Sequence, residues 1–337
     1  PAGIPLTSDY IQTFLDRRKP GQSKFTTARK ESDSVEILSG VFEGYTTGTP
    51  ISLIVRNTDQ RSHDYSKIKD CYRPGHADYT FDQKYGLRDY RGGGRTSGRE
   101  TIGRVAGGAI ACRILEALGI HLTTYTKAIG PFSIPSDAYD YSAINENQLY
   151  MPNQKYAEQA SAYLESCIRE HDSSGGLIEC MIHGMPSGIG EPVFNKLDAA
   201  LAKAVMSIGA VKGVEIGDGF SVVSSKGSKN NDSFFAENGQ ISKLTNHSGG
   251  ILGGLSDGSP ILLRAAIKPT PSISQPQKTV NTNGENIEIE ISGRHDPVIV
   301  PRAVVVVESM AAVTLVDLLM QNMSSRIEYM KQVYLGI

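Results

Sequence analysis

Residues 73–78 read Arg73-Pro74-Gly75-His76-Ala77-Asp78, and residues 91–100 read Arg91-Gly92-Gly93-Gly94-Arg95-Thr96-Ser97-Gly98-Arg99-Glu100. Glycines set among arginines let bare backbone amides and cations converge on one anionic group. His76 lies just upstream, and an imidazole can titrate near neutral pH. This composition predicts a site for a small phosphorylated ligand rather than a packed core, although a lone histidine in such a loop can equally be structural.

A helix is predicted directly after these arginines, over residues 101–118. Its apolar residues recur on one stripe, and a glycine follows as a stop signal. Ser97 and Glu100 have the spacing of a capping box, which by itself needs no ligand. The neighbouring Arg95 and Arg99 favour an anion at this helix N-terminus.

The order of the remaining predicted elements is mixed rather than strictly alternating, which favours an α+β fold over a doubly wound sheet. No linker divides the chain, so residues 1–337 are expected to form a single domain. Residues 95–118 and 294–320 have the same order of features: an arginine, then glycine or proline, then a predicted helix. This similarity suggests the hypothesis of an internal duplication. The predicted helices are residues 6–17, 156–170, 196–208 and 308–320, and the predicted strands are residues 35–42, 51–55, 177–183, 261–267 and 287–291.

Composition narrows the class of protein. The net charge of −2 argues against a general polyanion binder, but residues 15–30 hold six cations and one acid. A short basic segment in a neutral protein suits a compact anion better than a nucleic-acid backbone, which needs a long positive stripe. We therefore expect no nucleic-acid partner.

The four cysteines form no Cys-x-x-Cys pair, which favours reduced, buried thiols in a cytoplasmic protein. The histidines have no metal-ligand spacing, so no metal is expected. No apolar run is judged long enough to span a bilayer, so no membrane association is expected.

Residues 246–254 form a glycine-rich loop, Asn246-His247-Ser248-Gly249-Gly250-Ile251-Leu252-Gly253-Gly254. The loop lacks the strand–GxGxxG–helix context of a dinucleotide fold, and no Walker lysine follows it. A nicotinamide dehydrogenase and a P-loop enzyme are therefore disfavoured.

Two further segments carry candidate chemistry. Lys268-Pro269-Thr270-Pro271-Ser272 follows an apolar strand, and its lysine and hydroxyls can hold a phosphate, or the prolines can simply make a rigid turn. Arg294-His295-Asp296-Pro297 is either a site for a carboxylate base or a charge-balanced loop. Residue types alone leave both alternatives open.

At these residues the chain resembles the chorismate synthase family, over nearly its whole length. Three family signatures occur in order. They are Gly75–Asp78 through Arg95–Glu100, then Gly249-Gly250-Ile251-Leu252-Gly253-Gly254, then Gly293-Arg294-His295-Asp296-Pro297 with Pro301-Arg302-Ala303.

The resemblance implies a β-α-β sandwich protomer, a homotetramer and a carbon–oxygen lyase that acts on phosphates. The implied reaction is the anti 1,4-elimination of phosphate from 5-enolpyruvylshikimate 3-phosphate to give chorismate, the last common step of the shikimate pathway to the aromatic amino acids. The implied cofactor is reduced FMN (FMNH2), without net redox change, and NADPH would serve only to reduce the flavin.

The resemblance also implies roles for individual residues. His76 would be an acid near the reduced flavin or the substrate, and Asp296 would help to take the proton through flavin N5. The substrate or a neighbouring anion would lie against Arg18, Lys24, Arg73 and Arg99. FMN would be held by Arg95, Thr96, Ser97, Gly209, Ala210, Gly253, Lys268, Pro269, Thr270, Pro271, Ser272 and Arg294.

Some positions depart from the family pattern. Lys24 stands where arginine is usual, which keeps the charge but not the bidentate fork, and Gly209 stands where asparagine is common. The family's Gly-Glu-Ser-His-Gly motif, whose histidine is its second catalytic acid, does not occur in the printed sequence. We therefore expect the chain as printed to bind flavin but to turn over poorly.

Two other functions compete with the lyase. One is a flavin-dependent oxidoreductase that reduces its own FMN with NADPH, for which no nucleotide fingerprint is present. The other is a non-enzymatic module that binds phosphate or nucleic acid, which rests on the basic residues 17–30 alone.

Overall fold

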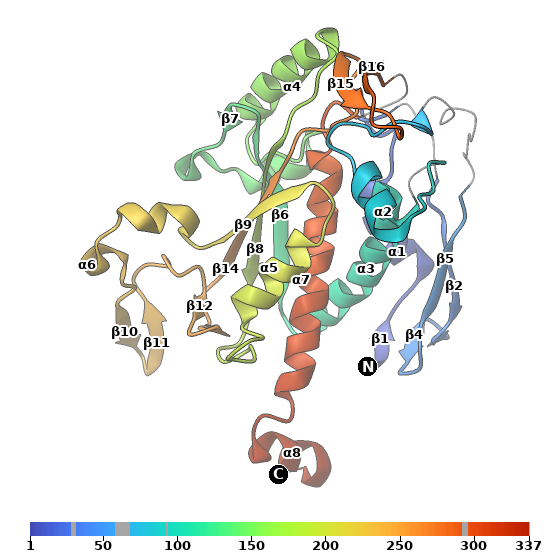
Figure 1. Ribbon diagram of the computed structural model, residues 1–337. Helices are drawn as coiled ribbons and strands as arrows, with labels where there is room; N and C mark the ends of the chain where they lie inside the picture. Colours follow the sequence, from blue (N-terminus) through green and yellow to red (C-terminus); the bar gives the residue numbers. More distant parts are fainter. Residues whose placement is uncertain (28–31, 58–67, 92–93, 292–295, 337) are drawn as a thin grey trace.

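The computed structural model describes residues 1–27, 32–57, 68–91, 94–291 and 296–336 (Figure 1). Arg294, which was predicted to hold the cofactor, lies outside these residues, and so does the side chain of Arg95.

A five-stranded antiparallel sheet forms one layer of the fold, in the order β7-β6-β8-β14-β9. Strand β14, which lies between β8 and β9, alternates strictly between buried and half-buried side chains, so one face of the sheet packs on a core. The strands are β7 (Phe132–Ser133), β6 (His121–Ile129), β8 (Gly176–His183), β14 (Ile261–Ile267) and β9 (Val211–Ile216).

Four helices form the middle layer, with α7 at its centre (Figure 1). Helix α7 lies between the sheet and α3, and it touches α3 so closely that a Cβ on Gly108 would lie 2.1 Å from Cβ of Ser309. The helices are α1 (Ser8–Arg18), α3 (Thr101–Ala117), α5 (Leu197–Met206) and α7 (Val300–Asn322).

Short strands cover the other side of α1 and α3 (Figure 1). One hairpin-like pair consists of β2 (Val35–Ser39) and β5 (Ser52–Val55), and β4 (Tyr45–Thr47) pairs with both β1 (Ala2–Pro5) and β3 (Val41–Phe42). The layers therefore run sheet, helices, strands, which confirms the predicted α+β, β-α-β sandwich.

The other elements lie around these layers. They are α2 (Asp78–Tyr85), η2 (Gly94–Thr96), η3 (Gly98–Glu100), η4 (Ser136–Ala138), η5 (Tyr141–Asn145), α4 (Gln154–Arg169), η6 (Gly219–Ser224), α6 (Gly227–Asn230), β10 (Phe234–Glu237), β11 (Gln240–Lys243), β12 (Ile251–Leu252), β13 (Leu255–Ser256), β15 (Pro276–Val280), β16 (Asn286–Glu290) and α8 (Ile327–Leu335).

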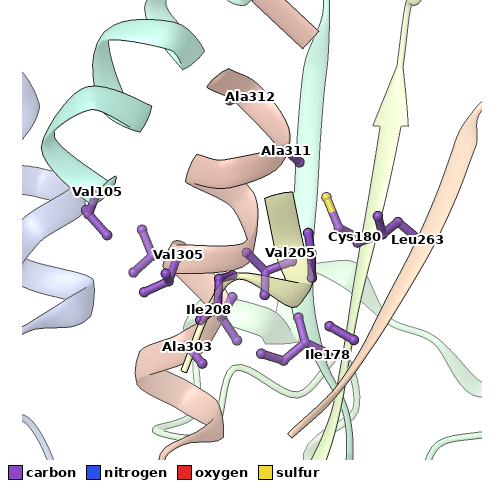
Figure 2. Packing of buried hydrophobic residues seen from close by; sticks show 14 of the residues in the cluster. Val105, Ile178, Cys180, Val205, Ile208, Leu263, Ala303, Val305, Ala311 and Ala312 are labelled. Atoms are coloured by element: carbon purple, nitrogen blue, oxygen red, sulfur yellow. The ribbon is translucent and has the colours of Figure 1, made fainter. Parts of the chain in front are cut away.

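One contiguous hydrophobic cluster joins the sheet to the helices, as Figure 2 shows for Ile178, Leu263, Val205 and Val305. Apolar burial of this extent is the main favourable contribution to folding. All four cysteines are buried and free of disulfide bonds, as predicted.

Three expectations about local structure were wrong. The predicted strand 35–42 is divided at Gly40, which has φ +83° and lies too close to Ile51 for any side chain. The last predicted helix begins at Val300 rather than Glu308, and the predicted elements lack helix α8 and strands β6 and β9 of the main sheet. The capping box does not form, because Ser97 caps η3 while Glu100 pairs with Arg104 at 2.8 Å.

The expectation about long apolar runs was also wrong. Helix α7 is long and apolar enough to cross a membrane by length and composition, with a mean hydropathy of 2.1. However, 61% of that apolar window is buried inside the protein. The core helix of a globular protein passes the same test, so its burial against α3 and the sheet accounts for its composition.

Candidate active site

The His76 loop lies against the loop of residues 268–272, which follows β14. Nδ1 of His76 is 3.0 Å from the carbonyl oxygen of Pro74, and Nε2 is 2.9 Å from Oγ of Ser272. A carbonyl oxygen only accepts, so Nδ1 carries the proton of the neutral ring and the Ser272 hydroxyl donates to Nε2. These two contacts fix the tautomer and the orientation of the imidazole.

Glycine is required beside His76. Gly75 has φ +70°, and a Cβ there would lie 2.7 Å from Cβ of Pro271. Nζ of Lys268 donates to the carbonyl oxygen of Gly75 at 2.7 Å. The sequence Pro74-Gly75-His76 is therefore matched in shape to the 268–272 loop.

The environment of His76 keeps its imidazole neutral. Burial and the nearby Arg73 guanidinium lower its pKa from 6.5 to about 4, against a smaller opposing effect of the Pro74 carbonyl. Lys268 also lowers this pKa. An anion bound beside these two cations would offset their charge and raise the pKa of His76 toward the neutral range.

The lowered pKa of His76 predicts an acid-sensitive contribution to stability. The unfolded chain binds a proton at this residue near pH 6.5, whereas the folded chain does so only near pH 4. The free energy of unfolding should therefore fall as the pH falls from about 6.5 to 4. Denaturant titrations should show a shallower fall over this window in His76→Ala, and an unchanged slope would contradict the buried, neutral assignment.

Arg73 is held as firmly as His76. Its Nε and Nη2 donate to the two carboxylate oxygens of Asp78 at 2.7 and 2.8 Å, and Arg88 approaches the same carboxylate at 3.2 Å. Arg88 also donates to three backbone carbonyls. Asp78 therefore positions Arg73 at the site, while Arg88 has the contacts of a structural residue.

A third segment joins the site at the start of β9. The backbone N–H of Lys268 donates to the carbonyl oxygen of Ala210 at 2.9 Å. Ala210 has φ +74°, a left-handed conformation that is unusual for a residue with a Cβ. Such strain clusters at functional sites, where the surrounding structure maintains it.

Ala210→Gly should stabilise the protein. Glycine adopts the left-handed region freely, whereas alanine is disfavoured there by about 1–2 kcal/mol, which glycine's extra chain entropy partly offsets. We expect a net gain of roughly 0.5–1 kcal/mol in the free energy of unfolding. Ala204→Gly, within helix α5, is the control and should destabilise. A loss of stability in Ala210→Gly would contradict the strained assignment.

Asp296 lies on the other side of the site, just before α7. Its Oδ1 accepts from the backbone N–H of Thr27 at 2.5 Å, and its Oδ2 accepts from Nη1 of Arg302 at 2.5 Å. The next residue, Pro297, accepts from the backbone N–H of Ser174 at 2.9 Å. Ser173, which precedes Ser174 in the chain, donates from Oγ to the carbonyl oxygen of Thr270 at 2.7 Å. The two serines thus link the Asp296 loop to the Lys268 loop.

Arg18 was predicted to contact the substrate, and the structure places it in a buried network. Its guanidinium donates to Asp33 at 2.6 Å, to Oγ1 of Thr101 at 3.0 Å and to the carbonyl oxygen of Gly98 at 3.1 Å. Its own carbonyl oxygen accepts from Nε of Arg302 at 2.9 Å. In this conformation Arg18 joins the start of α3 to the start of α7.

Helices α3 and α7 consequently begin at the same end of the molecule. Arg18 links Thr101 of α3 to Arg302 of α7. Seven residues further along each helix, Gly108 meets Ser309, so the two helices run parallel. Their N-terminal ends carry partial positive charge, which adds to the cations of the site. Anion binding is favoured where the two ends meet, next to Asp296.

Some predicted residues are not brought together. Lys24 is 59% exposed and pairs with Glu165 on α4. Gly253 belongs to the loop that precedes β14, whereas Lys268 directly follows that strand. The seven residues of β14 span roughly 20 Å, which separates the two loops. Directly before α3, Thr96 lies in η2, Ser97 caps η3 and Arg99 lies in η3, and Gly209 precedes Ala210.

Sequence reasoning missed several residues of the network. Thr27 acts through its backbone N–H, which no side-chain pattern reveals. Asp33 is one of several acids that follow the basic segment, and nothing in the sequence singles it out. Arg302 stands in the phrase Pro301-Arg302-Ala303, whose position after Asp296 was the only available signal. Among the described residues, no group of three or more His, Cys, Asp or Glu is arranged to hold a metal ion.

Cations, two parallel helix N-termini, a neutral histidine and a buried carboxylate thus define an enzyme site for an anionic ligand on an α+β scaffold. The family model "Chorismate synthase" matches residues 1–320. The chain therefore belongs to the chorismate synthase family, and it is an enzyme of the lyase class.

Individual relatives agree with the family match. The chain is 64% identical over 335 residues to the chorismate synthase of Lachnoclostridium phytofermentans, covering 99% of this chain and 91% of that protein. It is 53% identical over 321 residues to that of Methanocella arvoryzae, covering 94% and 86%. A crystal structure of a chorismate synthase superposes with a TM-score of 0.76 at 30% identity, covering 98% of this chain and 89% of that one.

Proposed function

We propose that this enzyme catalyses the anti 1,4-elimination of phosphate from 5-enolpyruvylshikimate 3-phosphate to give chorismate, with reduced FMN as its cofactor. One observation carries the proposal. The His76 loop is hydrogen-bonded to the Lys268 loop, and Ser173 and Ser174 join the Lys268 loop to the Asp296 loop at the start of α7, although these segments are distant in sequence. A substrate with one phosphate and two carboxylates needs such a concentration of positive charge.

The residues of the 268–272 loop fit a flavin phosphate. Oγ1 of Thr270 is buried without a hydrogen-bond partner within the described protein, although nearly all buried polar atoms in proteins have one. Lys268 adds a cation, and Ser272 and the strained Ala210 lie beside it. These residues would hold FMN together with the predicted Thr96, Ser97, Gly209, Pro269 and Pro271, and with Arg95 and Arg294.

The chain's own residues supply proton transfer and charge. Reduced FMN, held by the residues named above, would supply electron density for the loss of phosphate, without net redox change. Nε2 of His76, at present the acceptor of the Ser272 hydroxyl, would carry a proton once an anion offsets Arg73 and Lys268. Asp296 would help to take up the proton lost from the substrate ring, and the nearby cations would stabilise the departing phosphate.

The competing functions have less support. In the basic segment, Arg17 pairs with Glu308, Arg18 with Asp33, Lys19 with Asp16 and Lys24 with Glu165. Cations that are neutralised within the protein present little positive surface, which argues against a polyanion-binding module. Reduction of FMN by NADPH is kept as a second activity to test, and NADPH is otherwise only an indirect reductant.

We further propose a single-domain protomer in a cytoplasmic homotetramer that acts without nucleic acid, metal or membrane partners. The single hydrophobic cluster supports one domain. Large apolar side chains stay exposed on the protomer, including Phe194 at 91% and Val223 at 87%, as is common where subunits meet. Gly253, remote from Lys268 in the same chain, would reach a flavin site only from a second copy.

Chorismate formation tests the proposal. The protein is mixed anaerobically with 5-enolpyruvylshikimate 3-phosphate and chemically reduced FMN, without NADPH, and product is followed by absorbance. Product formation supports the lyase. If the protein gives no product and shows no substrate-dependent tightening of flavin binding, the proposal is contradicted. NADPH oxidation in the presence of FMN, in a separate reaction, decides the oxidoreductase alternative.

A further inference from the structure

Arg302, which belongs to the phrase Pro301-Arg302-Ala303, contacts Asp296 directly, and the family resemblance gave it no role. Nη1 of Arg302 donates to Oδ2 of Asp296 at 2.5 Å, and Nε donates to the carbonyl oxygen of Arg18 at 2.9 Å. The guanidinium is planar and rigid, so the bond to Arg18 fixes the direction in which Nη1 points. The Arg302 side chain is only 20% exposed and that of Asp296 only 9%.

Both oxygens of Asp296 are thereby engaged, Oδ2 by Arg302 and Oδ1 by the backbone N–H of Thr27 at 2.5 Å. Rotation of the carboxylate about its terminal bond would break both hydrogen bonds. Each oxygen retains a second lone pair, since a carboxylate has about four acceptor positions. The arrangement orients Asp296 while leaving it able to accept a proton.

The position of Arg302 argues against a role in helix stability alone. Arg302 lies in the first turn of α7, where the helix dipole disfavours a cation and favours an acid. By contrast, Arg17 makes a bidentate pair with Glu308 in the middle of α7, with both contacts at 2.9 Å, which joins two helices. A cation at an unfavourable helix position, aimed at a buried carboxylate, is better explained by that carboxylate.

We propose that Arg302 is a positioning residue, which holds the Asp296 carboxylate in the orientation needed to help remove the proton that the substrate loses. This role rests on the proposed elimination reaction. Arg302 acts through Asp296, so its loss should slow proton removal without weakening the binding of flavin or substrate.

Arg302→Ala is expected to lower kcat on the order of 100-fold, because small displacements of a reacting group have effects of this size. KM and the Kd for oxidised FMN, measured by fluorescence, should stay within about threefold. Arg302→Lys keeps the charge but not the second bond, and should recover part of kcat. Arg17→Ala is the matched control, since it removes a paired arginine that does not contact Asp296, and it should lower Tm with little change in kcat.

Two measurements separate positioning from folding. A cavity of about 250 Å³ lies beside Arg302, lined also by Arg17, Thr26 and Tyr150, so methylguanidinium should reach the vacated position. It should raise kcat in Arg302→Ala but not in Arg17→Ala. The changes in Tm of Arg302→Ala and Asp296→Asn should be non-additive in the double variant, since the two side chains share one contact. If Arg302→Ala does not fold, Arg302→Gln carries the same tests.

Several outcomes would overturn the role of Arg302. An unchanged kcat, or a rise in KM or in the Kd for FMN that accounts for the whole loss, would show that Arg302 does not act through Asp296. Additive changes in Tm would exclude the contact itself. An inactive wild-type holoenzyme would refute the proposed function, and this role would fall with it.

Discussion

His76→Ala is expected to lower kcat by about 100- to 10,000-fold, the usual contribution of a general acid or base. The affinity for FMN should change by no more than about threefold. The reason lies in the geometry, because His76 contacts the 268–272 loop through a single hydrogen bond from Ser272, whereas Lys268 bonds to the backbone of Gly75. Steady-state kinetics and flavin fluorescence titrations measure the two quantities separately.

His247→Ala is the matched control for this prediction. His247 also pairs with a polar partner, Asp218 at 2.7 Å, but it lies in the loop before β14, away from the His76 loop. Its loss should leave kcat within about twofold, since it touches no part of the proposed site. Equal losses of turnover and flavin affinity in His76→Ala would indicate that His76 is a structural residue.

Much of the fold could be predicted from local sequence because the local and tertiary preferences agree. Strand β14 was predicted with its observed bounds, since apolar residues at every second position bury one face of the sheet. The start of α7 could not be predicted in the same way. Val304–Val307 are β-branched and disfavour a helix in isolation, and only their burial between α3 and the sheet makes them helical.

The site was predictable in its composition but not in its pairings. Residue types identified the loops that carry His76, Lys268 and Asp296, because flexible glycines and clustered cations have few other uses. They could not show which acid neutralises which cation. Arg18 and Lys24 look equivalent in the sequence, yet one is buried against Asp33 and the other is exposed and paired with Glu165. Such pairings depend on contacts between segments up to 291 residues apart.

Gly108→Ala is expected to destabilise the protein by about 2–3 kcal/mol, because α3 and α7 are in backbone contact at this point. A Cβ on Gly108 would lie 2.1 Å from Cβ and 2.5 Å from Cα of Ser309. Rotation of a side chain cannot relieve a clash with Cα, so the helices must separate, and overpacking of a core commonly has this effect. The separation would also disturb the shared N-terminal end of the two helices, so kcat should fall as well.

Gly107→Ala provides a control within one residue of the same helix. Apart from the backbone of its own helix, no heavy atom of the described residues lies within 4 Å of a Cβ built on Gly107, and alanine is the better helix former by about 1 kcal/mol. This variant should therefore be slightly more stable than the wild type in urea titrations, while Gly108→Ala is less stable. Two neighbouring glycines with the same propensity would then differ in the sign of their effect. Equal shifts in the unfolding midpoint would mean that α3 and α7 have room at Ser309, and the close parallel contact that brings their N-terminal ends to one site would not exist.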